Sequence, residues 1–158
     1  MNASLVLVLV FLIGVVAGLR ALTAPTVVSW AGYLGWIHLT GSRLAFMGTL
    51  VAAIIFSVLA LAEIVNDKLP KTPARTAPPS LVIRMVLGAF AAATLSVGVG
   101  ASVIFGIILG IIGALVGTFG GYQVRTRTVK ALGVPDFVIA LVEDLIAVGG
   151  GFLLVSRF

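Results

Sequence analysis

The sequence lacks cysteine, has a single histidine, His38, and devotes only 9% of its 158 residues to charged side chains. Without cysteine there is no disulfide, thiolate metal site or cysteine nucleophile. One histidine in an aromatic-rich segment does not support a histidine-based triad or a zinc site. The chain also has no glycine-rich phosphate or dinucleotide motif and no Asp-rich metal motif. We therefore expect neither an enzyme nor a bound cofactor.

Apolar residues take the place of the missing charge. They make up 61% of the chain, and the mean hydropathy is +1.28. A soluble domain carries about a quarter charged residues, and a surface this apolar would aggregate in water. The net charge of +5 falls mainly between apolar segments, which indicates membrane topology rather than nucleic-acid binding. The expected partner is the lipid bilayer.

Five apolar segments are long enough to cross hydrocarbon as helices, which takes roughly 20 residues. They cover about residues 5–22, 44–62, 81–99, 102–121 and 137–155. Between the first two, residues 24–39 hold both tryptophans and one of the two tyrosines, which is typical of the headgroup level. The predicted fold is all-α, a single domain over residues 1–158. It is a polytopic bundle of about five transmembrane helices plus one interfacial or re-entrant helix, with a sixth tilted span as the alternative.

Basic residues are unevenly divided between the two sides of a five-span bundle. One side carries Lys68, Lys71, Arg75, Arg125, Arg127 and Lys130, and the other carries Arg20, Arg43 and Arg157. Loops rich in Lys and Arg stay in the cytoplasm. The N-terminus is therefore expected to be cytoplasmic and the C-terminus outside, a result that a sixth span would invalidate.

A weak internal repeat adds a second expectation. Residues 60–63 (ALAE) are echoed at 140–143 (ALVE), and residues 14–23 are loosely echoed at 117–126. In the five-span topology the first and fourth spans cross in opposite directions, which is the arrangement of an inverted repeat in transporters. Chance similarity among Ala, Leu and Gly is the alternative, since the two echoes need different sequence offsets. The repeat halves would cover about 4–70 and 102–157, with 81–99 as a connector helix.

Acidic residues are concentrated in the apolar segments. Four of the five in the chain are Glu63, Asp67, Glu143 and Asp144. Carboxylates in hydrocarbon are costly and default to a functional hypothesis, here a site that binds a cation, passes a proton or holds an organic substrate. The alternative is an interhelical salt-bridge network that locks the bundle. Both pairs are expected in the cytoplasmic half, near Arg84 and Arg125.

Arg20 ends the first span. Its long side chain is expected to snorkel to the headgroups, and the alternative is bidentate binding of a carboxylate or phosphate. Arg125, Arg127 and Lys130 are expected to enforce topology and to touch anionic lipid, with a dedicated phosphate site as the alternative.

Glycines recur four residues apart in the fourth segment. They are Gly106 and Gly110, then Gly113, Gly117 and Gly121. Such ridges of small residues let helix backbones approach closely. They are expected to pack within the bundle, and a homo-oligomer interface through these glycine-rich faces is the alternative.

Three stretches together resemble a known family. They are residues 18–21 (GLRA), 62–70 (AEIVNDKLP) and 141–144 (LVED). The chain resembles, over nearly its whole length, the bacterial membrane proteins grouped as domain of unknown function 4126. The Glu-x-x-x-Asp-Lys-x-Pro segment and the late Glu-Asp pair are the specific parts, and the arginine-rich stretch 122–130 departs from the pattern. The resemblance implies a multi-span inner-membrane protein of bacteria and no established activity.

The leading hypothesis is a small transporter or channel-like protein that carries a small ion or solute through an intramembrane carboxylate site. The residues assigned to that pathway are Glu63, Asp67, Glu143, Asp144, Arg20, Arg84 and Arg125. The second hypothesis is a non-catalytic membrane scaffold or lipid-interacting protein. It predicts that the acids are fully paired with arginines and that no water-lined cavity reaches them. An enzyme would need a cavity that joins the carboxylates to a metal or phosphate ligand.

Overall fold

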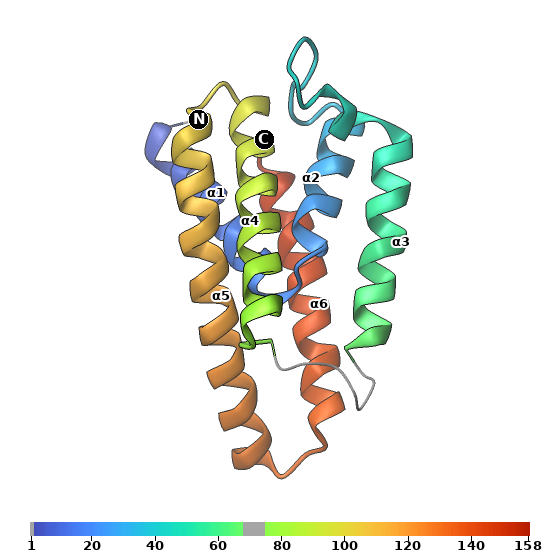
Figure 1. Ribbon diagram of the computed structural model, residues 1–158, viewed down its shortest axis with the longest axis vertical. Helices are drawn as coiled ribbons and strands as arrows, with labels where there is room; N and C mark the ends of the chain where they lie inside the picture. Colours follow the sequence, from blue (N-terminus) through green and yellow to red (C-terminus); the bar gives the residue numbers. More distant parts are fainter. Residues whose placement is uncertain (1, 68–74) are drawn as a thin grey trace.

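The computed structural model describes residues 2–67 and 75–158, and within those ranges the chain is helical without strands (Figure 1). The elements are α1 (Ala3–Leu19), α2 (Thr23–Tyr33), the short 3₁₀ helix η1 (Ala45–Gly48), α3 (Leu50–Asn66), α4 (Pro78–Gly98), α5 (Val103–Leu132) and α6 (Asp136–Val155). The predicted all-α class is confirmed. Lys68 and Lys71 lie outside the described residues.

Three of the described helices, α4, α5 and α6, are long and apolar enough to cross a membrane. The other two expected spans are the 17-residue apolar helices α1 and α3. At 1.5 Å per residue each extends about 25 Å, slightly less than the hydrocarbon core of about 30 Å. Large apolar side chains face outward, for example Leu145, which is 77% exposed, and Ile104, which is 70% exposed. This outward apolar surface is that of a helical membrane bundle.

The helices alternate in direction, and both chain termini lie at the same end of the bundle (Figure 1). The end of α3, the start of α4 and the connection from α5 to α6 lie at the opposite end. Arg75, Arg125 and Arg127 are therefore far from the N-terminus along the bundle axis. The predicted topology, with the N-terminus on the side of the basic loops and the C-terminus on the other, does not fit this arrangement. The reason is that α2 runs back toward the end at which α1 begins, which reverses the direction of every helix that follows relative to the five-span prediction.

The same return removes the basis of the expected inverted repeat. α1 and α5 run in the same direction, since Gly14 lies against Gly110 and Gly18 lies against Gly117 (Figure 1). The first and fourth spans were expected to cross in opposite directions. The halves 4–70 and 102–157 are therefore not related by inversion through this pair of helices.

α2 occupies the segment that was expected to be interfacial or re-entrant. Most of its 11 residues are buried, and it packs against α1, α3, α4 and α6 rather than lying on the surface. The chain breaks at Arg20, whose backbone is extended, and the new helix starts three residues later. Pro25 stands in the first turn of α2, where a missing N–H is tolerated; within a continuous helix its ring would clash with the carbonyl of residue 21. Proline thus explains why α1 and α2 are separate.

α5 is longer than the apolar segment from which it was predicted. Its 30 residues extend about 45 Å, so the helix continues well beyond the expected end at residue 121. Arg125, Arg127 and Lys130 were expected in a loop and are helical instead. The helix ends where Gly133 adopts a left-handed conformation, with φ of 62°. The length of α5 is thus set by its continuous backbone hydrogen bonds, which polar residues can make as well as apolar ones, and not by the hydropathy of its sequence.

Glycines bring α1, α4 and α5 into backbone contact. A Cβ on Gly117 would lie 2.2 Å from the carbonyl oxygen of Val15, and one on Gly110 would lie 2.4 Å from that of Gly88. The glycine ridge of α5 therefore packs within the chain. A contact between two copies of the protein through the same ridge would have to displace α1 or α4.

We predict that Gly117→Ala destabilises the protein by about 1–3 kcal/mol, because the added methyl has only backbone to displace. Gly120→Ala is the matched control on the same helix, since nothing lies within 4 Å of its Cβ position. Thermal unfolding in detergent should give a lower Tm for Gly117→Ala and an unchanged or slightly higher Tm for Gly120→Ala. Equal Tm values would show that the α1–α5 contact is looser than described.

Candidate functional site

The break between α1 and α2 leaves backbone polar groups inside the bundle, and two charged side chains bind them. The backbone N–H groups of Ala21 and Leu22 donate to the Glu63 carboxylate, each at 2.8 Å. The Arg84 guanidinium donates to the carbonyl oxygens of Gly18 and Leu19 at 2.8 and 2.9 Å. Unpaired backbone groups in hydrocarbon cost several kcal/mol each. Glu63 and Arg84 therefore act as caps for the start of α2 and the end of α1.

Arg20 lies at the break itself and is fully buried. Its guanidinium binds Asp67 at the end of α3 and Asp144 in α6. The expected snorkelling to the headgroups is therefore wrong: two carboxylates inside the bundle hold this side chain. Arg84 adds to the same group, with its Nη2 3.8 Å from Glu63 and 4.0 Å from Asp67. We call Arg20, Glu63, Asp67, Arg84 and Asp144 the inner cluster.

A second group lies toward the end with the basic residues. Arg75 makes a two-pronged contact with Glu143, and its Nη2 lies 2.7 Å from Oε2. Arg125 donates from Nε to Asp136 at 2.8 Å, and its Nη1 lies 3.5 Å from Glu143. Arg75, Arg125, Asp136 and Glu143 form the outer cluster. Its Arg125–Asp136 pair is the most accessible, since the Asp136 side chain is 61% exposed.

The two clusters meet on α6. Glu143 belongs to the outer cluster and its neighbour Asp144 to the inner one, so consecutive residues hold different arginines. The clusters together contain all five carboxylates of the chain and four arginines. Such pairing is expected where charges are removed from water, because an unpaired buried charge is far more costly than a paired one. Every acidic side chain in this protein is thus committed to one region.

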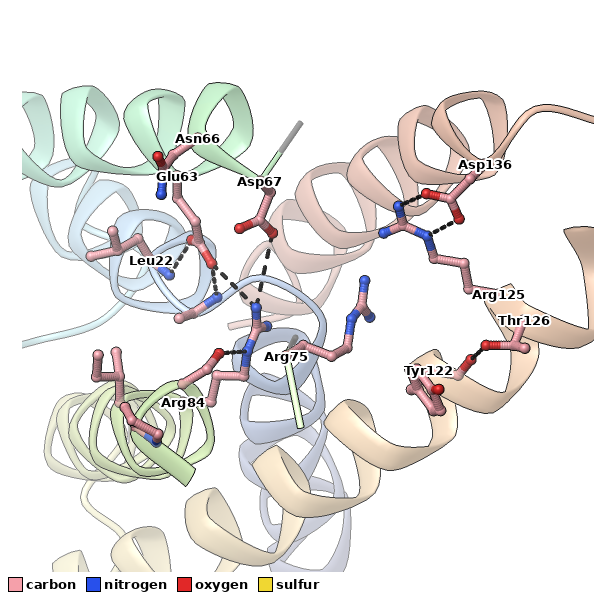
Figure 2. Close-up of a pocket in the computed structure, with 14 residues that line it drawn as sticks. Leu22, Glu63, Asn66, Asp67, Arg75, Arg84, Tyr122, Arg125, Thr126 and Asp136 are labelled. Carbon is pink, nitrogen blue, oxygen red and sulfur yellow. Dashed lines mark hydrogen bonds and ion pairs between the residues drawn. The ribbon is translucent and has the colours of Figure 1, made fainter. Parts of the chain in front are cut away.

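A cavity of about 500 Å³ lies between the clusters (Figure 2). Its charged lining is mixed, with Arg75, Arg84 and Arg125 facing Glu63, Asp67 and Asp136. The other lining residues are Ala21, Leu22, Asn66, Pro79, Ser80, Ile83, Tyr122 and Thr126. A cavity of this size can hold a small polar molecule, and its arginines suit binding of an oxyanion.

Residues 2–67 and 75–158 contain no group of three or more His, Asp or Glu side chains placed to hold a metal ion. Carboxylates in the site bind arginine or backbone N–H groups instead. The arrangement therefore offers charge-assisted hydrogen bonds to a bound molecule.

All seven residues singled out from the sequence lie in the two clusters. Glu143, Asp144 and Arg20 are buried and do not line the cavity. Sequence reasoning did not assign Arg75 and Asp136 to the site. Asp136 was the one remaining acid in the chain, and Arg75 was counted only as a topology signal. Because the chain has only five acidic residues, the scarcity of acids was the signal that could have assigned Asp136 to the site.

We predict that Arg84→Met destabilises the protein by about 3–5 kcal/mol, because it leaves the carbonyls of Gly18 and Leu19 without a donor and removes a buried positive charge beside Glu63 and Asp67. Arg125→Met removes an arginine from the accessible pair and leaves Glu143 bound by Arg75, so it should cost only about 1 kcal/mol. Thermal unfolding in detergent measures both. A Tm for Arg84→Met as high as that of Arg125→Met would contradict the capping role.

No curated protein and no solved structure matches the chain. A family model described as "Domain of unknown function (DUF4126)" matches residues 7–156, which is nearly the whole sequence and includes both clusters. The resemblance expected from the motifs around Arg20, Glu63 and Glu143 is confirmed. The chain belongs to the DUF4126 family.

Proposed function

We propose that this protein is a small, non-enzymatic transporter or channel-like protein of the bacterial inner membrane, and that the cavity between the two clusters is its substrate site. One observation carries the proposal: a cavity lined by three arginines and three carboxylates lies beside a helix break in an otherwise apolar bundle. Ionisable groups inside a membrane bundle generally mark a solute or ion pathway. Broken helices whose ends face a polar site are a recurrent feature of secondary transporters.

The two clusters support different tasks in this proposal. The inner cluster caps the backbone at the break and is already fully engaged in doing so. The outer cluster has the accessible Arg125–Asp136 pair, and both residues of this pair line the cavity. We assign substrate contact to Arg75, Arg125 and Asp136, and support of the fold to the inner cluster.

A non-catalytic scaffold is the second candidate, and one observation favours it. Each carboxylate has an arginine within ion-pair distance, as a purely structural network requires. The cavity counts against this candidate, because the scaffold hypothesis expects no such space at the acids. Glu63, Asp67 and Asp136 all line it.

We predict that vesicles containing the protein show flux of at least one probe among K⁺, chloride, inorganic phosphate and a fluorescent short-chain phospholipid. Arg75→Gln should lower that flux about tenfold, which corresponds to loss of one charge-assisted hydrogen bond of ~1.5 kcal/mol. Arg157→Gln, an exposed position after α6, is the control and should transport normally. Absence of flux for all probes would favour the scaffold, whereas equal flux in both variants would contradict the assignment of substrate contact to Arg75.

The orientation is part of the proposal. Arg75 lies just before the start of α4, and Arg125, Arg127 and Lys130 lie in the last turns of α5. Figure 1 shows the start of α4 and the end of α5 opposite to both termini. The bias toward cytoplasmic Lys and Arg then puts the two clusters near the cytoplasm and both termini outside.

We predict that alkaline phosphatase fused after Phe158 is active in bacteria, because that enzyme folds only outside the cytoplasm. A fluorescent protein that matures in the cytoplasm, fused at the same position, should stay dark. The reverse result would invert the proposed orientation and leave the helix arrangement unaffected.

A further inference from the structure

A shallow, open apolar groove lies on the outer surface of α3, near its C-terminal end. It is lined by Leu22, Leu59, Leu61, Ala62, Glu63, Val65 and Asn66. Its apolar side chains are exposed; Leu61 and Val65 are each 63% accessible. In a membrane such a groove is in contact with the acyl chains of lipids.

The groove adjoins the charged cavity. Leu22, Glu63 and Asn66 line both. A charged space between α3, α4, α5 and α6 and an apolar space on α3 thus lie side by side, with these three residues between them. Figure 2 shows Glu63 and Asn66 at the α3 side of the cavity, with Arg125 and Asp136 on other helices. A ligand that fits both spaces has a polar head and an apolar tail.

The charge pattern selects the sign of the head. Glu63, Asp67 and Glu143 are held by buried partners, so a cation would have to break those contacts to reach a carboxylate. Arg125 is held mainly by the exposed Asp136, and the nearby Glu143 keeps Arg75 as its closer partner, so the Arg125–Asp136 pair is the one most open to exchange with solvent or ligand. An incoming oxyanion can therefore take the place of Asp136 on Arg125. Arginine binds phosphate with two parallel hydrogen bonds, which suits such an exchange.

We propose that the substrate of this site is an anionic phospholipid, which enters sideways from the bilayer. Its phosphate binds Arg125 beside Arg75, and an acyl chain lies in the groove formed by Leu59, Leu61 and Val65. This inference rests on the proposed function, because it names the class of molecule that the transport site takes.

The test uses the full chain in a neutral detergent and follows its Tm during titration with three probes. Dioctanoyl phosphatidic acid has both the phosphate and the tails, dioctanoylglycerol has the tails alone, and inorganic phosphate has the charge alone. We expect a saturable rise in Tm with phosphatidic acid only. An equal rise with inorganic phosphate or with dioctanoylglycerol would overturn the inference, since one of the two spaces would then suffice.

Variants locate the binding. Arg125→Gln should weaken phosphatidic acid binding about tenfold or more, and Leu61→Trp should do the same by filling the groove. Leu145→Trp is the matched control, because Leu145 is 77% exposed on α6 and lines neither space. Binding that is unaffected by Leu61→Trp, or weakened equally by Leu145→Trp, would overturn the inference.

The two proposals fail separately. Flux of a water-soluble probe that depends on Arg75, without binding of phosphatidic acid, leaves the transport proposal standing and refutes the lipid substrate. Binding that depends on Leu61 and Arg125, without flux of any probe, refutes transport and supports the lipid site.

Discussion

The need to satisfy broken backbone inside a lipid-surrounded bundle determines much of this structure. Hydrocarbon offers no hydrogen bonds, so the groups released between Leu19 and Thr23 must be bound by the protein itself. Glu63 binds the amide groups and Arg84 the carbonyls. Both are charged, which makes these hydrogen bonds stronger than neutral ones. Charges in such surroundings need counter-charges. Arg84 lies near Glu63 and Asp67, and Arg20 binds Asp67 and Asp144.

Close packing of glycines makes the arrangement of the break feasible. Gly18 lies against the backbone of α5 at Ala114 and Gly117, so no side chain separates α1 from α5 at the level of the break. Thr118 of α5 is consequently near enough to donate to the carbonyl oxygen of Gly18 at 3.3 Å. Backbone packing on one side and charged caps on the other thus hold α1 in place. The cavity lies on the side of the charges, where the helices are kept apart by long polar side chains.

The sequence predicts the parts of this fold that depend on hydropathy and the parts of the site that depend on composition. Apolar segments correspond to α1 and α3–α6, and the scarcity of acids points to Glu63, Asp67, Glu143 and Asp144. Local pattern does not predict the direction of α2, because its 11 residues are buried by tertiary contacts rather than by strong periodicity. That single helix decides the topology. The partner of Arg20 was likewise hidden, since Asp144 is 124 residues distant in the chain.

This separation has a consequence for biosynthesis. Arg20 leaves the ribosome well before Asp67 and long before Asp144, so its charge has no partner when α1 first reaches the membrane. The nascent α1–α2 hairpin must therefore stay in a hydrated environment, or remain incompletely buried, until α3 and then α6 have been made. Arg20 therefore gains its second carboxylate only when α6 has been made, and a chain that ends before α6 has Asp67 but lacks Asp144 as a partner for this buried arginine.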